Sequence, residues 1–139
     1  MQMFSTSLDT GEEEHSITES NEAALVTQIE IEGRIFLFPG DIGEETEQNL
    51  KDVWLDVDVL KVAHHGSKYS TSSDFLTRVQ PEVAVISCGR KNRYGHPHEE
   101  TLERLEENNV ECYITAEEGA LRVREKQGQL ICESYENMQ

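Results

Sequence analysis

The amino-acid sequence predicts an α/β fold built on a sheet with mixed strand directions. Three features predict it: a β-hairpin after a polar N-terminal segment, strand-helix-strand order in the middle, and several short strands at the end. Strand-helix-strand order is typical of parallel strands, whereas hairpins add antiparallel ones. At 139 residues the chain has the length of one ordinary domain.

The first hairpin follows a segment with few bulky apolar side chains. Residues 1–21 are rich in Ser, Thr and Glu, and we expect a flexible or loop segment there, with the domain occupying 22–139. Residues 24–32 end in strict alternation of apolar and polar side chains, and a Glu-Gly turn leads into an apolar strand at 34–38. This pattern predicts a β-hairpin.

Helices and strands alternate in the middle of the chain. A Glu-rich helix is predicted at 44–51 and a strand at 57–63, which ends at two histidines. Thr71 and Asp74 have the spacing of a capping box, which predicts a helix over 72–80.

The second half continues with a strand, a helix and three short strands. Pro97 suits the first position of the helix, where its missing N–H costs no hydrogen bond. That helix ends near Asn108. The predicted strands lie at 83–87, 110–115, 119–124 and 129–132.

The charge of the chain restricts its partners. There are 28 acidic and 12 basic side chains, giving a net charge of −16, which argues against independent binding to nucleic acid or an anionic membrane surface. No apolar run approaches the roughly 20 residues that cross a bilayer, so we expect a soluble fragment without membrane insertion. Three widely spaced cysteines indicate free thiols rather than a disulfide framework.

Ionisable side chains gather where predicted strands end. In open α/β sheets ligands bind beyond the carboxyl ends of the strands, so the segments at 39–41, 64–67 and 95–98 are the natural site candidates. They contain four of the five histidines, and His15 has no evident role.

Each candidate has an alternative interpretation. Asp41 and the pair His64-His65 suit a divalent metal, but an Asp beside a Gly is also common in turns. Side chains of adjacent residues at a strand end point to opposite sides, so a purely structural role is harder to assign to both histidines at once. His96 and His98 resemble a metal pair, yet His96 could cap the helix while His98 lies in its first turn.

Other chemistries lack their defining motifs. The sequence has no GxSxG elbow, P-loop, GxGxxG or HExxH, so esterase, nucleotide triphosphatase, dinucleotide-binding and zincin functions have no support. Arg90, Lys91 and Arg93 form a basic cluster that could hold a phosphate or could be a solvated loop. Cys88 follows a strand, but a core thiol is the simpler interpretation.

Three ordered runs, at 34–43, 58–67 and 84–98, together resemble one family. They are similar to the metallo-β-lactamase-like domain at the C-terminus of ComEC-type competence (DNA-uptake) proteins and to related free-standing hydrolases. The resemblance extends over about residues 21–123. It implies an αββα sandwich with a site for one or two divalent ions, Zn or Mn, at its edge.

The resemblance also implies roles for individual residues. Asp41 would be a bridging metal ligand and His65 the late histidine ligand, and these two would be the catalytic residues. Four other side chains would line the substrate phosphate: His64, Ser67, His96 and His98. Which of His64 and His65 meets the metal is open from sequence, and His65 is favoured.

One departure from the family pattern is decisive. The principal metal motif, HxHxDH, belongs to the first half of that fold and is absent here. We therefore expect the C-terminal half of the domain, whose partner is the missing N-terminal half. Two strong ligands fall short of the three that catalytic zinc requires, so this chain alone should bind metal weakly and be inactive. Its uncovered sheet face favours self-association.

The resemblance leaves two functions open for the longer protein. The first is a metal-dependent nuclease or phosphodiesterase that cleaves DNA or nucleotides during DNA uptake. The longer protein would then be either membrane-associated, with this domain outside the cytoplasm, or a free-standing soluble hydrolase. The alternative is a degenerate, non-catalytic module used for assembly or binding in a DNA-uptake machine.

Overall fold

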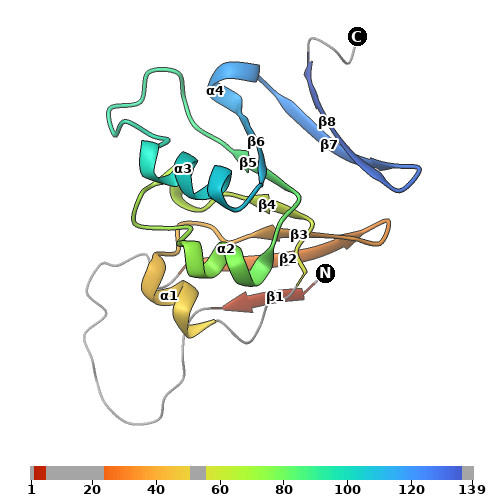
Figure 1. Ribbon diagram of the computed structural model, residues 1–139, viewed down its shortest axis with the longest axis horizontal. Helices are drawn as coiled ribbons and strands as arrows, with labels where there is room; N and C mark the ends of the chain where they lie inside the picture. Colours follow the sequence, from red (N-terminus) through yellow and green to blue (C-terminus); the bar gives the residue numbers. More distant parts are fainter. Residues whose placement is uncertain (1, 6–23, 51–55, 136–139) are drawn as a thin grey trace.

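A computed structural model describes residues 2–5, 24–50 and 56–135 (Figure 1). The described strands are β1 Gln2–Ser5, β2 Leu25–Ile31, β3 Arg34–Phe38, β4 Val59–Lys61, β5 Val83–Ile86, β6 Glu111–Ile114, β7 Leu121–Lys126 and β8 Gln129–Ser134. The described helices are α1 Glu44–Asn49, α2 Ser73–Val79, α3 Glu99–Glu107 and α4 Thr115–Glu118, and a single short turn, η2, spans Ala63–Gly66.

The main sheet has six strands in the order β1-β2-β3-β4-β5-β6. The strands from β1 to β3 pair antiparallel, and those from β3 to β6 pair parallel. Strands β7 and β8 form a separate antiparallel hairpin. The predicted α/β fold with a mixed sheet and a hairpin at each end is therefore confirmed.

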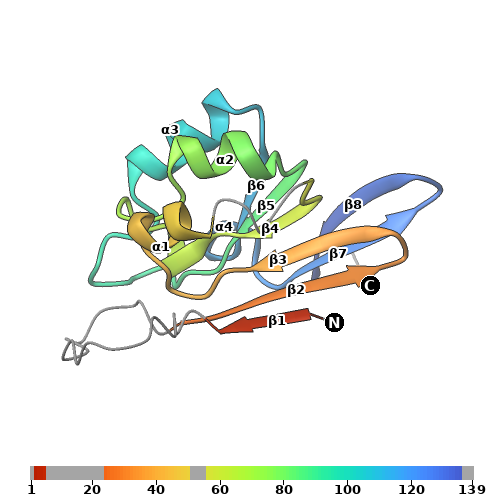
Figure 2. The ribbon, with the colours of Figure 1, turned by 90° about the horizontal axis from the view of Figure 1, so that it is seen from below.

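Helices α1, α2 and α3 lie on one face of the main sheet (Figure 2). The strands contribute Leu37, Leu60 and Ile86 to the core beneath them, and all three are fully buried. Phe75 of α2 and Leu105 of α3 pack into the same core. Burying a side chain of this size contributes about 1.5–3 kcal/mol, so these contacts fix the helices on the sheet.

The opposite face of the sheet has two parts. Strand residues alternate between faces, so Phe38 points away from buried Leu37, and the β2–β3 register places Leu25 and Ile31 on the same face as Phe38. These three side chains are 39%, 54% and 48% exposed. Farther along the same face, Val59 of β4 is buried. The β2–β3 end of this face is therefore apolar and uncovered by the described residues.

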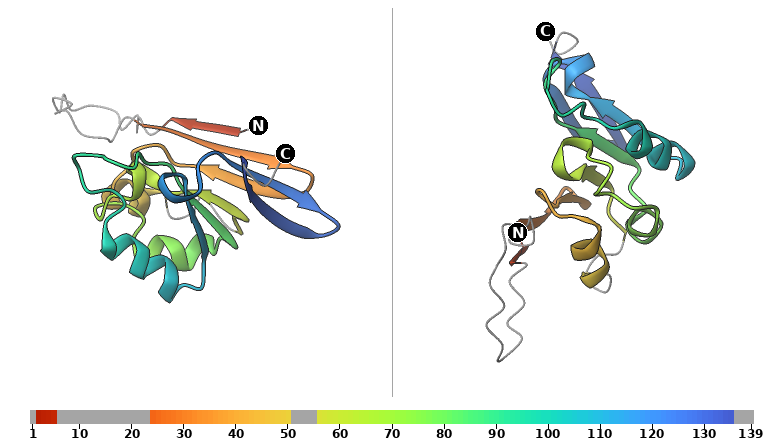
Figure 3. Two further views of the ribbon diagram at one scale, coloured as in Figure 1. Left: turned by 90° about the horizontal axis from the view of Figure 1, so that it is seen from above. Right: turned by 90° about the vertical axis from the view of Figure 1, so that its left-hand side faces the viewer.

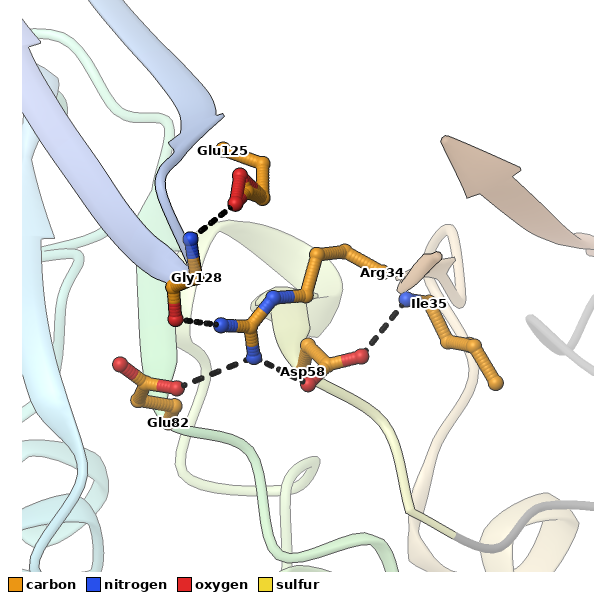
Figure 4. A network of polar contacts seen from close by, with 6 residues as sticks. All are labelled: Arg34, Ile35, Asp58, Glu82, Glu125 and Gly128. Carbon is orange, nitrogen blue, oxygen red and sulfur yellow. Dashed lines mark hydrogen bonds and ion pairs between the residues drawn. The ribbon is translucent and has the colours of Figure 1, made fainter. Parts of the chain in front are cut away.

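The β7–β8 hairpin is tied to the amino ends of the parallel strands. Figure 3 shows the hairpin beside the main sheet, and Figure 4 shows the contacts at its turn. The Arg34 guanidinium donates to Asp58 Oδ1 at 3.0 Å and to the Gly128 carbonyl at 2.6 Å. Asp58 in turn accepts from the Ile35 amide at 2.7 Å. Arg34 thus connects β3, the start of β4 and the hairpin turn.

Two predicted helix starts are wrong by one or two positions. The N-cap of α2 is Ser72, whose hydroxyl accepts from the Phe75 amide, whereas Thr71 has φ of 56° and cannot occupy the cap. The N-cap of α3 is His98, so Pro97 precedes that helix instead of beginning it. In both cases tertiary contacts of the preceding loop determine where the helix starts.

The terminal segments add one finding. Strand β1 lies within the predicted flexible segment 1–21, yet it pairs with β2. The rest of that segment, and the end of the predicted helix at 44–51, lie outside the described residues.

Among the helices in the described ranges, none has the length and apolar character needed to cross a bilayer.

Candidate functional site

The three loops predicted to form a site meet at the carboxyl edge of the parallel strands. The His64 amide donates to the Gly40 carbonyl at 3.0 Å, which joins the loop after β3 to the turn after β4. The His98 amide donates to the Gly66 carbonyl at 2.9 Å, which joins that turn to the loop after β5. These bonds bring half-buried Asp41 and four histidines to one edge.

The two adjacent histidines adopt a conformation that the strand pattern did not predict. His64 and His65 have φ of 48° and 56°, so β4 ends before them and they form a left-handed turn. Such φ values are uncommon outside glycine and cost of order 1–3 kcal/mol each, which the surrounding contacts must offset. Gly66 completes the turn, and a Cβ there would lie 2.6 Å from the Pro97 Cβ.

A hydrogen bond from the His65 side chain defines the state of its ring. Its Nδ1 lies 2.7 Å from the Ser87 carbonyl oxygen at the end of β5. A carbonyl oxygen only accepts, so Nδ1 carries the proton and the Nε2 lone pair is left for another partner. Histidines that bind metals commonly have their second nitrogen held in this way. The bond thus leaves the His65 ring in the tautomer that a metal ligand binding through Nε2 requires.

His98 has the opposite arrangement. The Lys68 amide donates to its Nδ1 at 3.0 Å, and its Nε2 lies 3.2 Å from the Tyr94 carbonyl. Because Nδ1 accepts, Nε2 carries the proton and donates to that carbonyl. Both ring nitrogens are therefore used in holding the loops together, and this geometry indicates a structural role for His98.

His96 lies at the centre of the histidine cluster. Its ring centroid is 5.7 Å from that of His64, 6.3 Å from that of His65 and 4.8 Å from that of His98. Burial lowers the pKa of His96, the neighbouring imidazoles lower it further, and the Asp41 carboxylate opposes them. The cluster thus favours a neutral His96.

Ser67 and two residues not identified from sequence stabilise the loop after η2. Ser67 is buried, and its hydroxyl accepts from the Tyr69 amide at 3.3 Å. Arg104 of α3 donates to the carbonyls of Lys68, Ser70 and Thr71 at 2.9–3.3 Å.

The second of these residues is Glu47, which is fully buried and accepts from the amides of Thr71 and Ser72. Burial raises the pKa of Glu47, while those amides counteract the rise. Nothing in the acidic pattern distinguishes Glu47 from its exposed neighbours, and the contacts of Arg104 are equally absent from local sequence.

An open pocket of about 210 Å³ lies beside the cluster. It is lined by His65, Cys88, Gly89, Asn92, Tyr94 and His96. Cys88 is a free thiol, and its backbone is bonded to the Thr115 hydroxyl. The pocket places a small-molecule-sized space directly against the candidate metal ligand His65.

The described residues contain fewer potential metal ligands at this edge than a complete metal site needs. No group of three or more His, Cys, Asp or Glu side chains within them is arranged to hold an ion. Asp41 and His65 offer one oxygen and one nitrogen donor, which suit zinc or manganese. Lys61 is half-buried near this edge, where burial lowers its pKa and the Asp41 charge opposes that effect.

Comparison with known proteins finds several relatives of one type. The chain is 39% identical over 108 residues to ComE operon protein 3 of Bacillus subtilis, a match that covers 76% of this chain. It is 42% identical over 87 residues to Recombination protein 2 of Haemophilus influenzae, covering 63% of the chain. The chain is homologous to a segment of ComEC-type competence proteins. No family profile matches it.

The ComEC-type relatives are much longer than the segment they share with this chain. Competence protein ComA of Neisseria gonorrhoeae is 34% identical over 107 residues, covering 75% of the chain. The matches span 14%, 11% and 16% of the lengths of the three relatives. The homology therefore concerns one segment of a ComEC-type protein and leaves the rest of such proteins unrepresented.

Proposed function

We propose that this chain is the C-terminal part of a metal-dependent hydrolase domain of the metallo-β-lactamase type, within a protein that cleaves phosphodiester bonds of DNA or nucleotides during DNA uptake. The observation that carries the proposal is the state of His65. Its Nδ1–H donates to the Ser87 carbonyl, which leaves the Nε2 lone pair available to bind a metal at the edge that also carries Asp41. Kinship with competence proteins supports the biological setting.

In this proposal Asp41 and His65 are the metal ligands and catalytic residues, and zinc or manganese is the cofactor. When bound, such an ion supplies Lewis acidity toward a phosphoester and acidifies water. Two donors are fewer than a catalytic ion requires. The remaining ligands would come from a preceding half-domain that carries an HxHxDH motif.

The other histidines divide into two roles. The His96 ring lies beside those of His64 and His65, and His64 and His96 would contact the substrate phosphate. The family resemblance implies the same for His98 and Ser67. Their hydrogen bonds to Lys68, Tyr94 and Tyr69 instead support an indirect role, in which they hold the loops that carry the phosphate-binding side chains.

The apolar sheet face that the described residues leave uncovered supports an incomplete domain. Leu25, Ile31 and Phe38 would be covered by the preceding half in the longer protein. In this chain alone the same surface would favour self-association, because exposed apolar area is reduced when copies pair.

The alternative function is a non-catalytic module that retains the fold for assembly or binding in a DNA-uptake machine. The absence of a three-donor group in the described part of the chain is compatible with it. The two functions differ in what happens when upstream sequence of the longer protein is restored.

The decisive experiment measures metal content and hydrolysis of bis-p-nitrophenyl phosphate by the chain extended upstream by a half-domain. We expect metal-dependent turnover that is lost in Asp41→Ala and His65→Ala and retained in the controls Glu44→Ala and His15→Ala. Normal turnover by both site variants would show that the ligand assignment is wrong. An extended protein that folds, yet neither binds metal nor turns over substrate, would favour the non-catalytic module.

A further inference from the structure

The pocket beside His65 has an aromatic side chain on its rim. Tyr94 lines the pocket, yet 62% of the residue is exposed. Its ring lies 5.7 Å from the His96 ring with an angle of 23° between the planes, which is a stacked arrangement. The pocket therefore has a largely exposed aromatic residue on its rim, next to the centre of the histidine cluster.

The loop that carries Tyr94 is held from both sides. The Asn92 side chain donates to the carbonyls of Gly89 and His96 at 3.0 and 2.6 Å and accepts from the His96 amide at 2.7 Å. The Tyr94 carbonyl accepts from the His98 ring. An aromatic side chain on such a fixed loop loses little conformational entropy when a planar ligand stacks on it.

Positive charge accompanies the ring. The Arg93 guanidinium donates to the Tyr94 hydroxyl at 2.9 Å, and its carbon lies 5.1 Å from the ring centroid. Arg90 and Lys91, both exposed, precede it in the same loop. Three of the 12 basic side chains of this acidic protein thus lie within four consecutive residues. An exposed aromatic ring with adjoining cations is the arrangement that binds single-stranded nucleic acid through base stacking and phosphate contacts.

We propose that Tyr94 is a specificity-determining residue that stacks on an unpaired nucleobase next to the phosphate at the histidine cluster. The proposal rests on the proposed function, and it specifies the substrate as a single strand or an unpaired end. Bases inside a duplex already stack on one another, so their faces are closed to Tyr94. Unpaired bases of any identity present a free face, so little sequence preference is expected.

The test is a titration of the ¹³C,¹⁵N-labelled 139-residue chain, followed by NMR at about 0.15 M salt, which screens the repulsion between DNA and the net charge of −16. The two probes are hexathymidylate and a stable blunt-ended DNA duplex. We expect the single strand to bind more tightly and to shift the Tyr94 ring protons upfield, because a stacked base places them in its ring current. Tyr94→Ala should weaken single-strand binding by about fivefold or more, whereas Tyr94→Phe should retain it.

The matched control is Tyr135→Ala, since Tyr135 is 57% exposed and follows β8, outside the pocket lining. It should leave binding unchanged. Equal affinity for the duplex and the single strand, equal losses at Tyr94 and Tyr135, or no single-strand binding at millimolar concentration would each overturn the proposal. The titration requires no turnover, so its outcome is independent of whether the extended protein hydrolyses a phosphodiester.

Discussion

The imidazole of His65 donates from Nδ1 to the Ser87 carbonyl oxygen, 2.7 Å away at the end of the neighbouring strand. The bond links the left-handed turn after β4 to the carboxyl end of β5. It places the proton on Nδ1 of His65 and leaves the Nε2 lone pair available to a ligand. At His98 the Lys68 amide donates to Nδ1, so the proton is on Nε2 instead. The two rings therefore hold their protons on different nitrogens.

The first prediction follows from this difference. In NMR spectra that correlate ring protons with ring nitrogens, recorded at a pH at which both rings are neutral, His65 should show the Nδ1–H tautomer and His98 the Nε2–H tautomer. The Nδ1–H form is set by the carbonyl acceptor of Ser87, and the Nε2–H form by the amide donor of Lys68. The reverse assignment at His65 would remove the main support for its role as a metal ligand.

The second prediction concerns Glu47. Glu47→Ala leaves the amides of Thr71 and Ser72 without their acceptor in a buried environment, and it should destabilise the protein by about 2–4 kcal/mol. Glu47→Gln should have an intermediate effect, because its amide keeps a single acceptor oxygen. Urea denaturation measures both. Glu45→Ala, an exposed position on the same helix, is the control and should have almost no effect.

The arrangement of the main elements follows from local sequence. Alternation of side chains located β2, and an apolar run bounded by a Glu-Gly turn located β3. The rule that ligands bind beyond the carboxyl ends of parallel strands brought three loops together, as the hydrogen bonds from the His64 and His98 amides confirm. Local patterns sufficed here because each depends on one element and its immediate turn.

The state of the individual site residues depends on contacts between distant parts of the chain. The partner of the His98 Nδ1 lies 30 residues away, and Glu47 is separated from Thr71 by 24 residues. The left-handed turn at His64 and His65 was likewise missed, since non-glycine residues enter that conformation only under tertiary constraint. The sequence thus identified the loops that meet at this edge, whereas the hydrogen-bond partners of their side chains depend on the fold.

The third prediction tests the attachment of the β7–β8 hairpin. Arg34→Ala removes the donor to Asp58 and to the Gly128 carbonyl, so the hairpin turn should open more often. Hydrogen exchange should become several-fold faster at amides near Gly128 while amides in β5 keep their protection. Arg122→Ala, an exposed cation on the hairpin itself, is the comparison and should leave the turn attached. Equal acceleration in both variants would mean that Arg34 does not anchor the hairpin.

The fourth prediction concerns pH and the same hairpin. Hydrogen bonds from Arg124 and Arg122 lower the pKa of Glu133 from 4.5 to about 2. Because the folded pKa is the lower one, the unfolded chain binds more protons between these values, so the stabilisation is complete above about pH 4.5 and is lost as the pH falls toward 2.

An NMR titration of the Glu133 carboxyl carbon should show the low midpoint. Urea denaturation above and below this pH window measures how the free energy of unfolding depends on pH. Glu133→Gln should remove this part of the pH dependence, whereas Glu117→Gln, at an exposed site, should leave it unchanged. An ordinary midpoint for Glu133 would mean that the two arginines are too mobile in solution to hold its charge.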